Sequence, residues 1–151
     1  MASLLSLISS SPTRTLSQGE VLIVQGEAGG DLFVLEGGEL IVERDGVEIA
    51  RINQPGSTVG EMSVLVGTRN SATVRADREA RVRVVRDAFK YIEQDPALAL
   101  RLAAVVAGRL EATSALLVEL SKQSKDKPSE QRLLDRIFSA LQVTVAGKGE
   151  A

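Results

Sequence analysis

Glycines recur through the first half of the chain and divide it into short apolar runs. Between Leu16 and Arg86 these runs read VLIVQ, LFVLE, LIVER, VEIARI, ATVRA and RVRVV. Each is rich in β-branched residues and short enough for a strand. Asp45-Gly46 stands between two of them and is a strong signal for a β-hairpin. Regular short strands separated by turns predict a sandwich or barrel in this part of the chain.

Beyond Arg86 the pattern becomes helical. Pro96 suits the first turn of a long helix, and Asp95 is placed to cap that helix. Apolar residues then recur at alternating spacings of four and three, which is typical of a coiled-coil seam. The seam residues are Ala99, Ala103, Val106, Leu110, Thr113, Leu117 and Leu120. The seam predicts a homodimer through the long helix, while the stripe of Leu98, Leu102 and Val105 can face the β-domain. The alternative is that the last helix buries both stripes.

The two ends of the chain are expected to be short appendages. Leu4 to Ile8 form an apolar run without a basic flank, which predicts a short amphipathic helix rather than a signal peptide. After the polar break SKQSKDKPSE, a final amphipathic helix follows, which could lid a ligand or contact a protein partner. Its apolar face comprises Leu133, Leu134, Ile137, Phe138 and Leu141. The predicted divisions are an arm (1–12), the β-domain (13–95), the long helix (96–124), and a linker, helix and tail (125–151).

Composition excludes several classes of function. The 151 residues include no histidine and no cysteine, so zinc sites of the Cys/His kind, cysteine nucleophiles and histidine-dependent acid–base catalysis are ruled out. A net charge of -2 gives no reason to expect nucleic acid as a partner. No segment reaches the roughly 20 apolar residues of a membrane span, and we expect a cytoplasmic protein.

The stretch GEMSVLVG, which begins at Gly60, combines features of a ligand site. A helix N-terminus exposes backbone N–H groups that suit an anion, and glycine allows close approach to the backbone. Glu61 could accept a hydrogen bond from a hydroxyl beside that anion, and Ser63 adds a short side-chain donor. An anion next to a hydroxyl describes a sugar phosphate. The alternative is structural, because a glutamate in the first turn is favourable for the helix dipole alone and Gly60 could serve a turn.

The longer stretch VGEMSVLVGTRNSATV resembles the phosphate-binding cassette of cyclic-nucleotide-binding domains. The likeness extends upstream to GEVLIVQGEAGGDLFVLEGGELIV and downstream to a helix similar to the dimerisation helix of the catabolite activator type, covering about Leu16 to Leu120. The resemblance implies a mainly β fold with flanking helices. That fold is a double-stranded β-helix, a jelly-roll-like β-roll, with a short cassette helix and C-terminal helices.

The resemblance also implies roles for individual residues. Gly60, Met62 and Ser63 would offer donors near a cyclic phosphate, and Glu61 would accept from the ribose 2′-hydroxyl. Ser71 and Ala72 would close the phosphate pocket, and a hydroxyl at position 71 often favours guanine over adenine. Thr113 and Ser114 match a Thr-Ser pair that touches adenine, partly across a dimer. The implied ligand is cyclic AMP or cyclic GMP, and no cofactor is expected.

One position departs from the family pattern. The arginine that pairs with the cyclic phosphate is replaced by Asn70, and Arg69 stands one place earlier. An asparagine can donate a hydrogen bond but cannot neutralise a phosphate. Three interpretations stay open: Arg69 turns inward and binding is kept, the pocket takes a different ligand, or the domain has lost its ligand and serves dimerisation or protein interaction.

Competing classes of function have less support. Cupin-like metal enzymes need clustered histidines, which the chain lacks. Hydrolysis by carboxylates alone would need paired acids such as Glu61 and Asp31 in one cleft. A transcription factor would need a helix-turn-helix after the long helix, and a single amphipathic helix is too little for that. We therefore expect a sensing or interaction module and no enzyme.

Overall fold

The structure, a computed structural model, describes residues 2–140. It divides the chain into two compact units, the first ending at Arg101 and the second beginning at Leu102. Leu141 and the expected tail lie outside the described residues.

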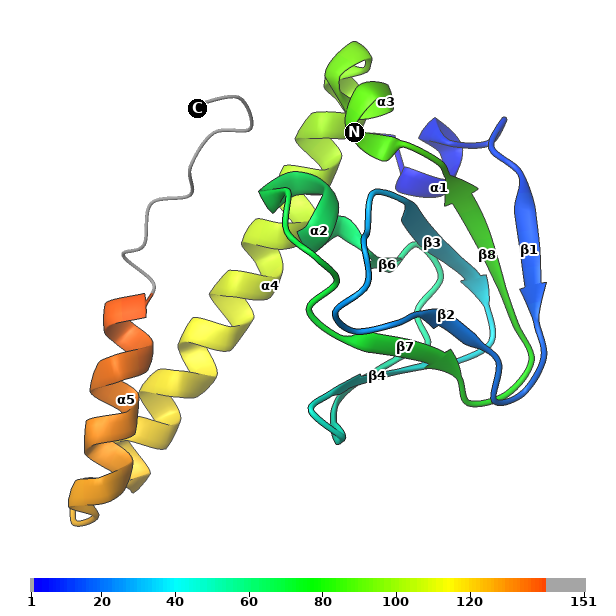
Figure 1. Cartoon of the computed structure of the whole chain (residues 1–151). Helices are drawn as coiled ribbons and strands as arrows, with labels where there is room; N and C mark the ends of the chain where they lie inside the picture. Colours follow the sequence, from blue (N-terminus) through cyan, green and yellow to red (C-terminus); the bar gives the residue numbers. More distant parts are fainter. Residues whose placement is uncertain (1, 141–151) are drawn as a thin grey trace. The chain divides into compact units, whose positions relative to one another are not determined.

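The strands of the first unit form two antiparallel four-stranded sheets (Figure 1). One sheet has the order β1-β8-β3-β6 and the other the order β2-β7-β4-β5. The strands are β1 (Thr13–Leu16), β2 (Val21–Ile23), β3 (Leu32–Gly37), β4 (Leu40–Arg44), β5 (Val47–Ile52), β6 (Thr58–Val59), β7 (Thr73–Ala76) and β8 (Ala80–Val85). The predicted mainly β fold, a jelly-roll-like β-roll with flanking helices, is confirmed.

Alternation along the strands creates the core. In β8, Ala80, Val82 and Val84 are buried, while Arg81 and Arg83 between them are more exposed. This period of two places apolar side chains on one face of each sheet. The cluster that both sheets contribute is Leu16, Ile23, Phe33, Leu35, Leu40, Val59, Val74, Ala76, Ala80, Val82 and Val84. Burial of these side chains is the main stabilising contribution to this unit.

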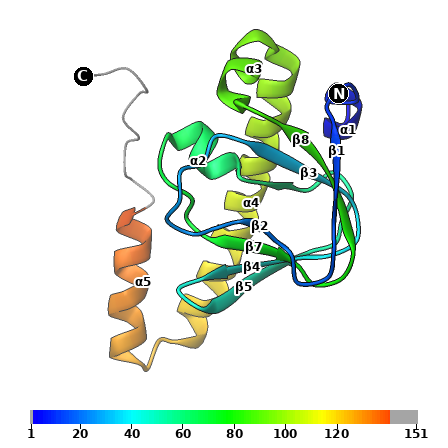
Figure 2. The same cartoon turned by 45° about the vertical axis from the view of Figure 1, so that its right-hand side comes forward.

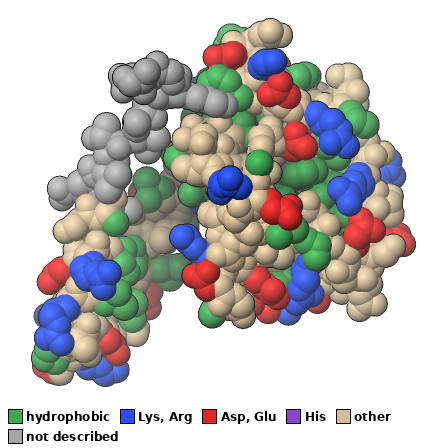
Figure 3. Space-filling model, viewed as in Figure 1, with side chains coloured by type: hydrophobic (Ala, Val, Ile, Leu, Met, Phe, Trp, Pro, Cys, Tyr) green, Lys and Arg blue, Asp and Glu red, His purple; other side chains and the backbone are tan. Residues whose placement is uncertain are grey.

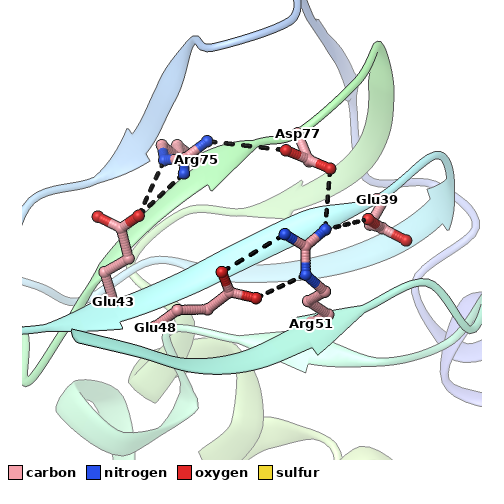
Figure 4. Close-up of polar contacts among 6 residues, drawn as sticks. All are labelled: Glu39, Glu43, Glu48, Arg51, Arg75 and Asp77. Carbon is pink, nitrogen blue, oxygen red and sulfur yellow. Dashed lines mark hydrogen bonds and ion pairs between the residues drawn. The ribbon is translucent and has the colours of Figure 1, made fainter.

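The outward residues of the second sheet pair their charges (Figure 4). Arg51 on β5 donates to Glu39 at 2.9 Å and to Asp77 at 3.0 Å, and it also pairs with Glu48. Hydrogen bonds from Arg51 to Glu48, Asp77 and Glu39 raise the pKa of the guanidinium. Because Arg51, Glu48 and Asp77 are solvent-exposed, their pairs contribute little stability.

The hairpin that the sequence predicted is confirmed, whereas two of the strands were not predicted. Asp45 and Gly46 join β4 to β5, both with positive φ (52° and 78°), as a two-residue hairpin requires. The strands β1 and β6 were missed: TRTL alternates weakly, and β6 has only two residues. Thr58–Val59 becomes a strand through tertiary pairing with Phe33 and Val34.

Three short helices flank the sheets, and two longer ones follow. They are α1 (Leu4–Leu7), α2 (Glu61–Val66), α3 (Ala88–Gln94), α4 (Pro96–Gln123) and α5 (Pro128–Ala140). The expected N-terminal helix is confirmed, and Leu4 and Ile8 are buried. Asp95 caps α4, because its Oδ1 accepts from the backbone N–H groups of Ala97 (3.1 Å) and Leu98 (3.2 Å). Within residues 2–140, no helix has the length and hydrophobicity that a membrane crossing requires.

In the second unit, α4 and α5 lie antiparallel as a helical hairpin (Figure 2). The amide Nε2 of Gln131 donates to the Ser121 carbonyl at 3.0 Å, and the Ser124 hydroxyl donates to the Glu130 carboxylate. On α4 beyond Gly108, the half-buried positions are Ser114, Leu117 and Ser121. Their spacing of three and four defines one face, which α5 covers. Of the seam residues, Leu117 is therefore on the side of α5, whereas Leu110, Thr113 and Leu120 remain exposed.

The core should dominate the stability of the first unit. We expect Leu40→Ala to lower the free energy of unfolding by about 2–5 kcal/mol, because Leu40 is fully buried and its loss leaves a cavity. Val47→Ala on the exposed strand β5 is the control and should change the free energy by about 0.5 kcal/mol or less. Urea denaturation measures both. Equal losses would contradict this placement of the core.

Candidate functional site

The candidate site begins at Gly60, which caps the short helix α2. Gly60 has a φ of 86°, in the left-handed region that favours glycine. A Cβ at this position would lie 2.6 Å from the carbonyl oxygen of Asp31. The sequence suggested that this glycine lets a ligand approach or serves a turn. The structure gives it a further reason, since the chain's own backbone occupies the space beside it.

The next residues alternate between the interior and the surface. Glu61 and Ser63 are each 6% exposed, whereas Met62 between them is 51% exposed. The Ser63 hydroxyl donates to the Gly60 carbonyl at 3.1 Å. The carboxylate of Glu61 is thus held away from bulk water, at the start of an element whose position the close contact with Asp31 fixes. A carboxylate in such surroundings is a strong hydrogen-bond acceptor.

Arg69 and Asn70 are both engaged with the loop between β2 and β3 (residues 24–31). Arg69 Nη1 donates to the Gly26 carbonyl at 3.2 Å, and Asn70 Nδ2 donates to the Val24 carbonyl at 3.2 Å. The backbone adds two bonds of 2.9 Å, from Asn70 N to Glu27 O and from Gly26 N to Asn70 O. The end of the cassette and this loop therefore form one hydrogen-bonded piece.

Gly29 packs closely against both Ser63 and Asn70. A Cβ at Gly29 would lie 2.6 Å from both Asn70 Oδ1 and Ser63 Cβ. The loop thus packs its bare backbone against the beginning and the end of the cassette. Sequence reasoning treated the Gly29-Gly30 pair as turn punctuation and missed this role. A pair of adjacent glycines is an ordinary turn signal, so nothing in the local sequence marked this contact.

Asp31 links the same loop to the start of α3. Its carbonyl lies beside Gly60, and its Oδ1 accepts from the backbone N–H of Asp87 at 3.1 Å. The neighbouring Gly30 carbonyl accepts from Ala88 N at 2.9 Å. Asp87 itself has a φ of 47°, which makes this junction a tightly specified turn. The first residues of α2 and of α3 are therefore both positioned by Gly30–Asp31.

The remaining predicted site residues lie in two places. Ser71 and Ala72 follow Asn70 and are half-buried at the entry to β7. Thr113 and Ser114 lie on α4 in the second unit, where Thr113 is exposed and Ser114 is on the face that α5 covers. Among residues 2–140, no group of three or more acidic, cysteine or histidine residues is arranged to hold a metal ion.

Comparisons with known proteins identify the family of the first unit. Residues 13–92 match the family model described as Cyclic nucleotide-binding domain. The chain is 37% identical over 122 residues to Glutaminase 2 of Bradyrhizobium diazoefficiens. The match covers 76% of this chain and 19% of that protein. Overall, the chain spans 10–19% of the length of relatives that it matches.

Two solved structures have a similar fold. The catabolite activator protein of Thermus thermophilus has a TM-score of 0.65 and 28% identity, and the match covers 78% of this chain and 59% of that one. The cAMP-bound PfPKA-R has a TM-score of 0.59 and 23% identity, with 73% and 37% covered. At this identity, the second likeness concerns the fold alone.

Gly60 offers a direct test of how the site is positioned. We expect Gly60→Ala to lower the free energy of unfolding by about 2–5 kcal/mol, from the left-handed φ and from overlap with the Asp31 carbonyl. Gly19→Ala is the matched control: its φ of 83° is close to the 86° of Gly60, but nothing lies within 4 Å of the added Cβ. It should lose only about 1–2 kcal/mol. If urea denaturation gives equal losses, the contact with Asp31 is not a constraint.

Proposed function

The chain belongs to the cyclic nucleotide-binding domain family, and we propose that it is a regulatory module that binds cyclic AMP or cyclic GMP weakly. Binding at the cassette is coupled to movement of the C-terminal helices. The observation that carries this proposal is the buried carboxylate of Glu61 within the matched residues. The family is one of binding domains, and the proposed module acts as a sensor in the cytoplasm.

The position of Glu61 supports recognition of a ribose. Glu61 is 6% exposed as a residue and its Oε2 is buried, so water competes little for the lone pairs of that oxygen. Such a carboxylate can accept a hydrogen bond from the 2′-hydroxyl of a ribose. The amide groups at the start of α2, together with Ser71 and Ala72, are the proposed surroundings of the cyclic phosphate. The proposed base contacts are Thr113 and Ser114.

Asn70 is the reason for proposing weak affinity. One of its amide hydrogens already donates to Val24, and the group carries no charge. A hydrogen bond to a charged group is worth about 1.5–3 kcal/mol, or about 10- to 100-fold in affinity. Arg69, whose guanidinium donates to the Gly26 carbonyl, would have to leave that contact to replace the missing charge.

The junction at Gly30–Asp31 supports coupling to the helices. A ligand that shifts Gly60 and Glu61 presses on Asp31, whose side chain accepts from the residue before α3. Gly30–Asp31 therefore contacts both the cassette and the start of α3. In this proposal a displacement of the cassette shifts the start of α3. In this proposal the protein exchanges between two conformations of the helices. The ligand shifts that equilibrium only as far as its affinities for the two conformations differ.

A second candidate is a module without a ligand that serves dimerisation or protein interaction. It is favoured by the exposed leucines of α4, among them Leu110 (51% exposed) and Leu120 (45%). In both candidates we propose a homodimer through α4, with α5 available to a protein partner.

Replacing Asn70 tests the sensor. We expect Asn70→Arg to bind cyclic AMP or cyclic GMP about 10-fold or more tightly than the wild type, because a guanidinium can neutralise the phosphate. Isothermal titration calorimetry measures both proteins. Arg69→Ala is the control and should leave the weak wild-type binding unchanged. Tight wild-type binding that Arg69→Ala abolishes would contradict the role of Asn70, and the absence of binding in every variant would favour the second candidate.

Replacing Leu110 tests the dimer. Leu110→Glu should convert the dimer to a monomer in sedimentation equilibrium, because the contact cannot accommodate a buried unpaired charge. Ala115→Glu places the same charge on an exposed position five residues on, about 140° around the helix from Leu110, and should remain a dimer. If both variants sediment like the wild type, the seam is not an interface.

A further inference from the structure

The α4–α5 hairpin covers only one side of each helix. The buried or half-buried positions of α5 are Glu130, Gln131, Leu134, Ile137 and Phe138, which share one face. They face Ser114, Leu117 and Ser121 of α4, with Gln131 bonded to Ser121 at 3.0 Å. The expected apolar face of α5 is thus largely confirmed, but Leu133 is 53% exposed and is not part of it.

The hairpin lacks a core of its own. Among residues 102–140, the apolar side chains that are buried are Leu102 and Leu134. More apolar side chains remain exposed: Leu110, Leu116, Val118, Leu120 and Leu133. Helices are marginal in water unless an apolar face packs against another element. Two helices with so little buried apolar surface therefore need a further partner.

Three of the exposed leucines lie on the same side of the hairpin. Leu116 and Leu120 are four residues apart on α4 and so share a face. Leu116 stands one residue before the covered Leu117, as Leu133 stands one residue before the buried Leu134. Two antiparallel helices are related by an approximate two-fold axis normal to their common plane. Equivalent positions therefore point to the same side, and we name Leu116, Leu120 and Leu133 the leucine patch.

The α4–α5 hairpin carries charges of both signs in similar numbers. Basic and acidic side chains are interspersed with apolar ones on the hairpin (Figure 3). Between residues 109 and 136, the basic residues are Arg109, Lys122, Lys125, Lys127, Arg132 and Arg136, and the acidic ones are Glu111, Glu119, Asp126, Glu130 and Asp135. Neither a phosphate polymer nor a strongly charged protein is favoured by such a surface. A second copy of the same surface offers opposite charges across a two-fold axis.

We propose that the leucine patch packs against the leucine patch of a second copy, so that two α4–α5 hairpins form an intermolecular four-helix bundle. Four helices are the arrangement in which paired hairpins bury a common core. This inference rests on the dimer proposed above and changes its form. The patch adjoins the seam at Thr113, three residues before Leu116, whereas Leu110 lies about 120° from Leu116 around α4. In this dimer α5 is part of the interface, which a two-stranded coiled coil of α4 alone would not require.

Glutamate variants of the full chain separate the two forms of the dimer. Sedimentation equilibrium should give a dimer for the wild type, a monomer for Leu133→Glu, and a dimer for Ser139→Glu, whose charge lies on another side of α5. If Leu110→Glu dissociates the dimer and Leu133→Glu does not, the bundle is overturned while the dimer through α4 stands. If the wild type is a monomer, both proposals fail.

A cysteine variant gives a second measurement that does not depend on disrupting the fold. The chain contains no cysteine, so Leu133→Cys introduces a single thiol near the proposed two-fold axis. Mild oxidation should yield a covalent dimer of Leu133→Cys in non-reducing electrophoresis and little covalent dimer of Ser139→Cys. Equal yields from the two variants, or cross-linking of Ser139→Cys alone, would overturn the bundle.

Discussion

The carbonyl oxygen of Asp31 lies 2.6 Å from where a side chain at position 60 would begin, and much of the site depends on that contact. It leaves room only for glycine, and the left-handed backbone of Gly60 then turns the chain into α2. Glu61 follows at once and enters the interior. The side chain of Asp31 also accepts a hydrogen bond from the backbone N–H of Asp87, the residue before α3. A single loop residue thereby positions both the candidate ligand acceptor and the first of the C-terminal helices.

The charges of the cassette follow from the same packing. The loop of residues 24–31 presses Gly29 against Ser63 and Asn70, and the side chains of Arg69 and Asn70 donate to its carbonyls. Some N–H groups of Arg69 and Asn70 that could bind an anion therefore already donate to the loop. Elsewhere in the first unit, several arginines are paired with carboxylates, as Arg75 is with Glu43 at 2.9 Å. The ligand that we propose would therefore meet little positive charge at the cassette.

The sequence was sufficient for the architecture and insufficient for the contacts within the site. Alternation, glycine spacing and the Asp95 cap are local signals, so most strands and the start of α4 could be predicted. The strand β6 and the role of Gly29 depend on residues far away in the chain, and no local pattern encodes them. Leu117 was assigned to a partner because heptad spacing does not tell which helix covers a stripe. The engagement of Arg69 and Asn70 with the β2–β3 loop likewise emerged only from the folded backbone.

The central claim is that the carboxylate of Glu61 accepts the 2′-hydroxyl of a bound cyclic ribonucleotide. Calorimetry with cyclic AMP and cyclic GMP, and with their 2′-deoxy counterparts, on wild type and Glu61→Ala forms a thermodynamic cycle. The account predicts that removing the hydroxyl weakens binding to the wild type and has little effect on Glu61→Ala. An equal loss of affinity in both proteins would contradict it.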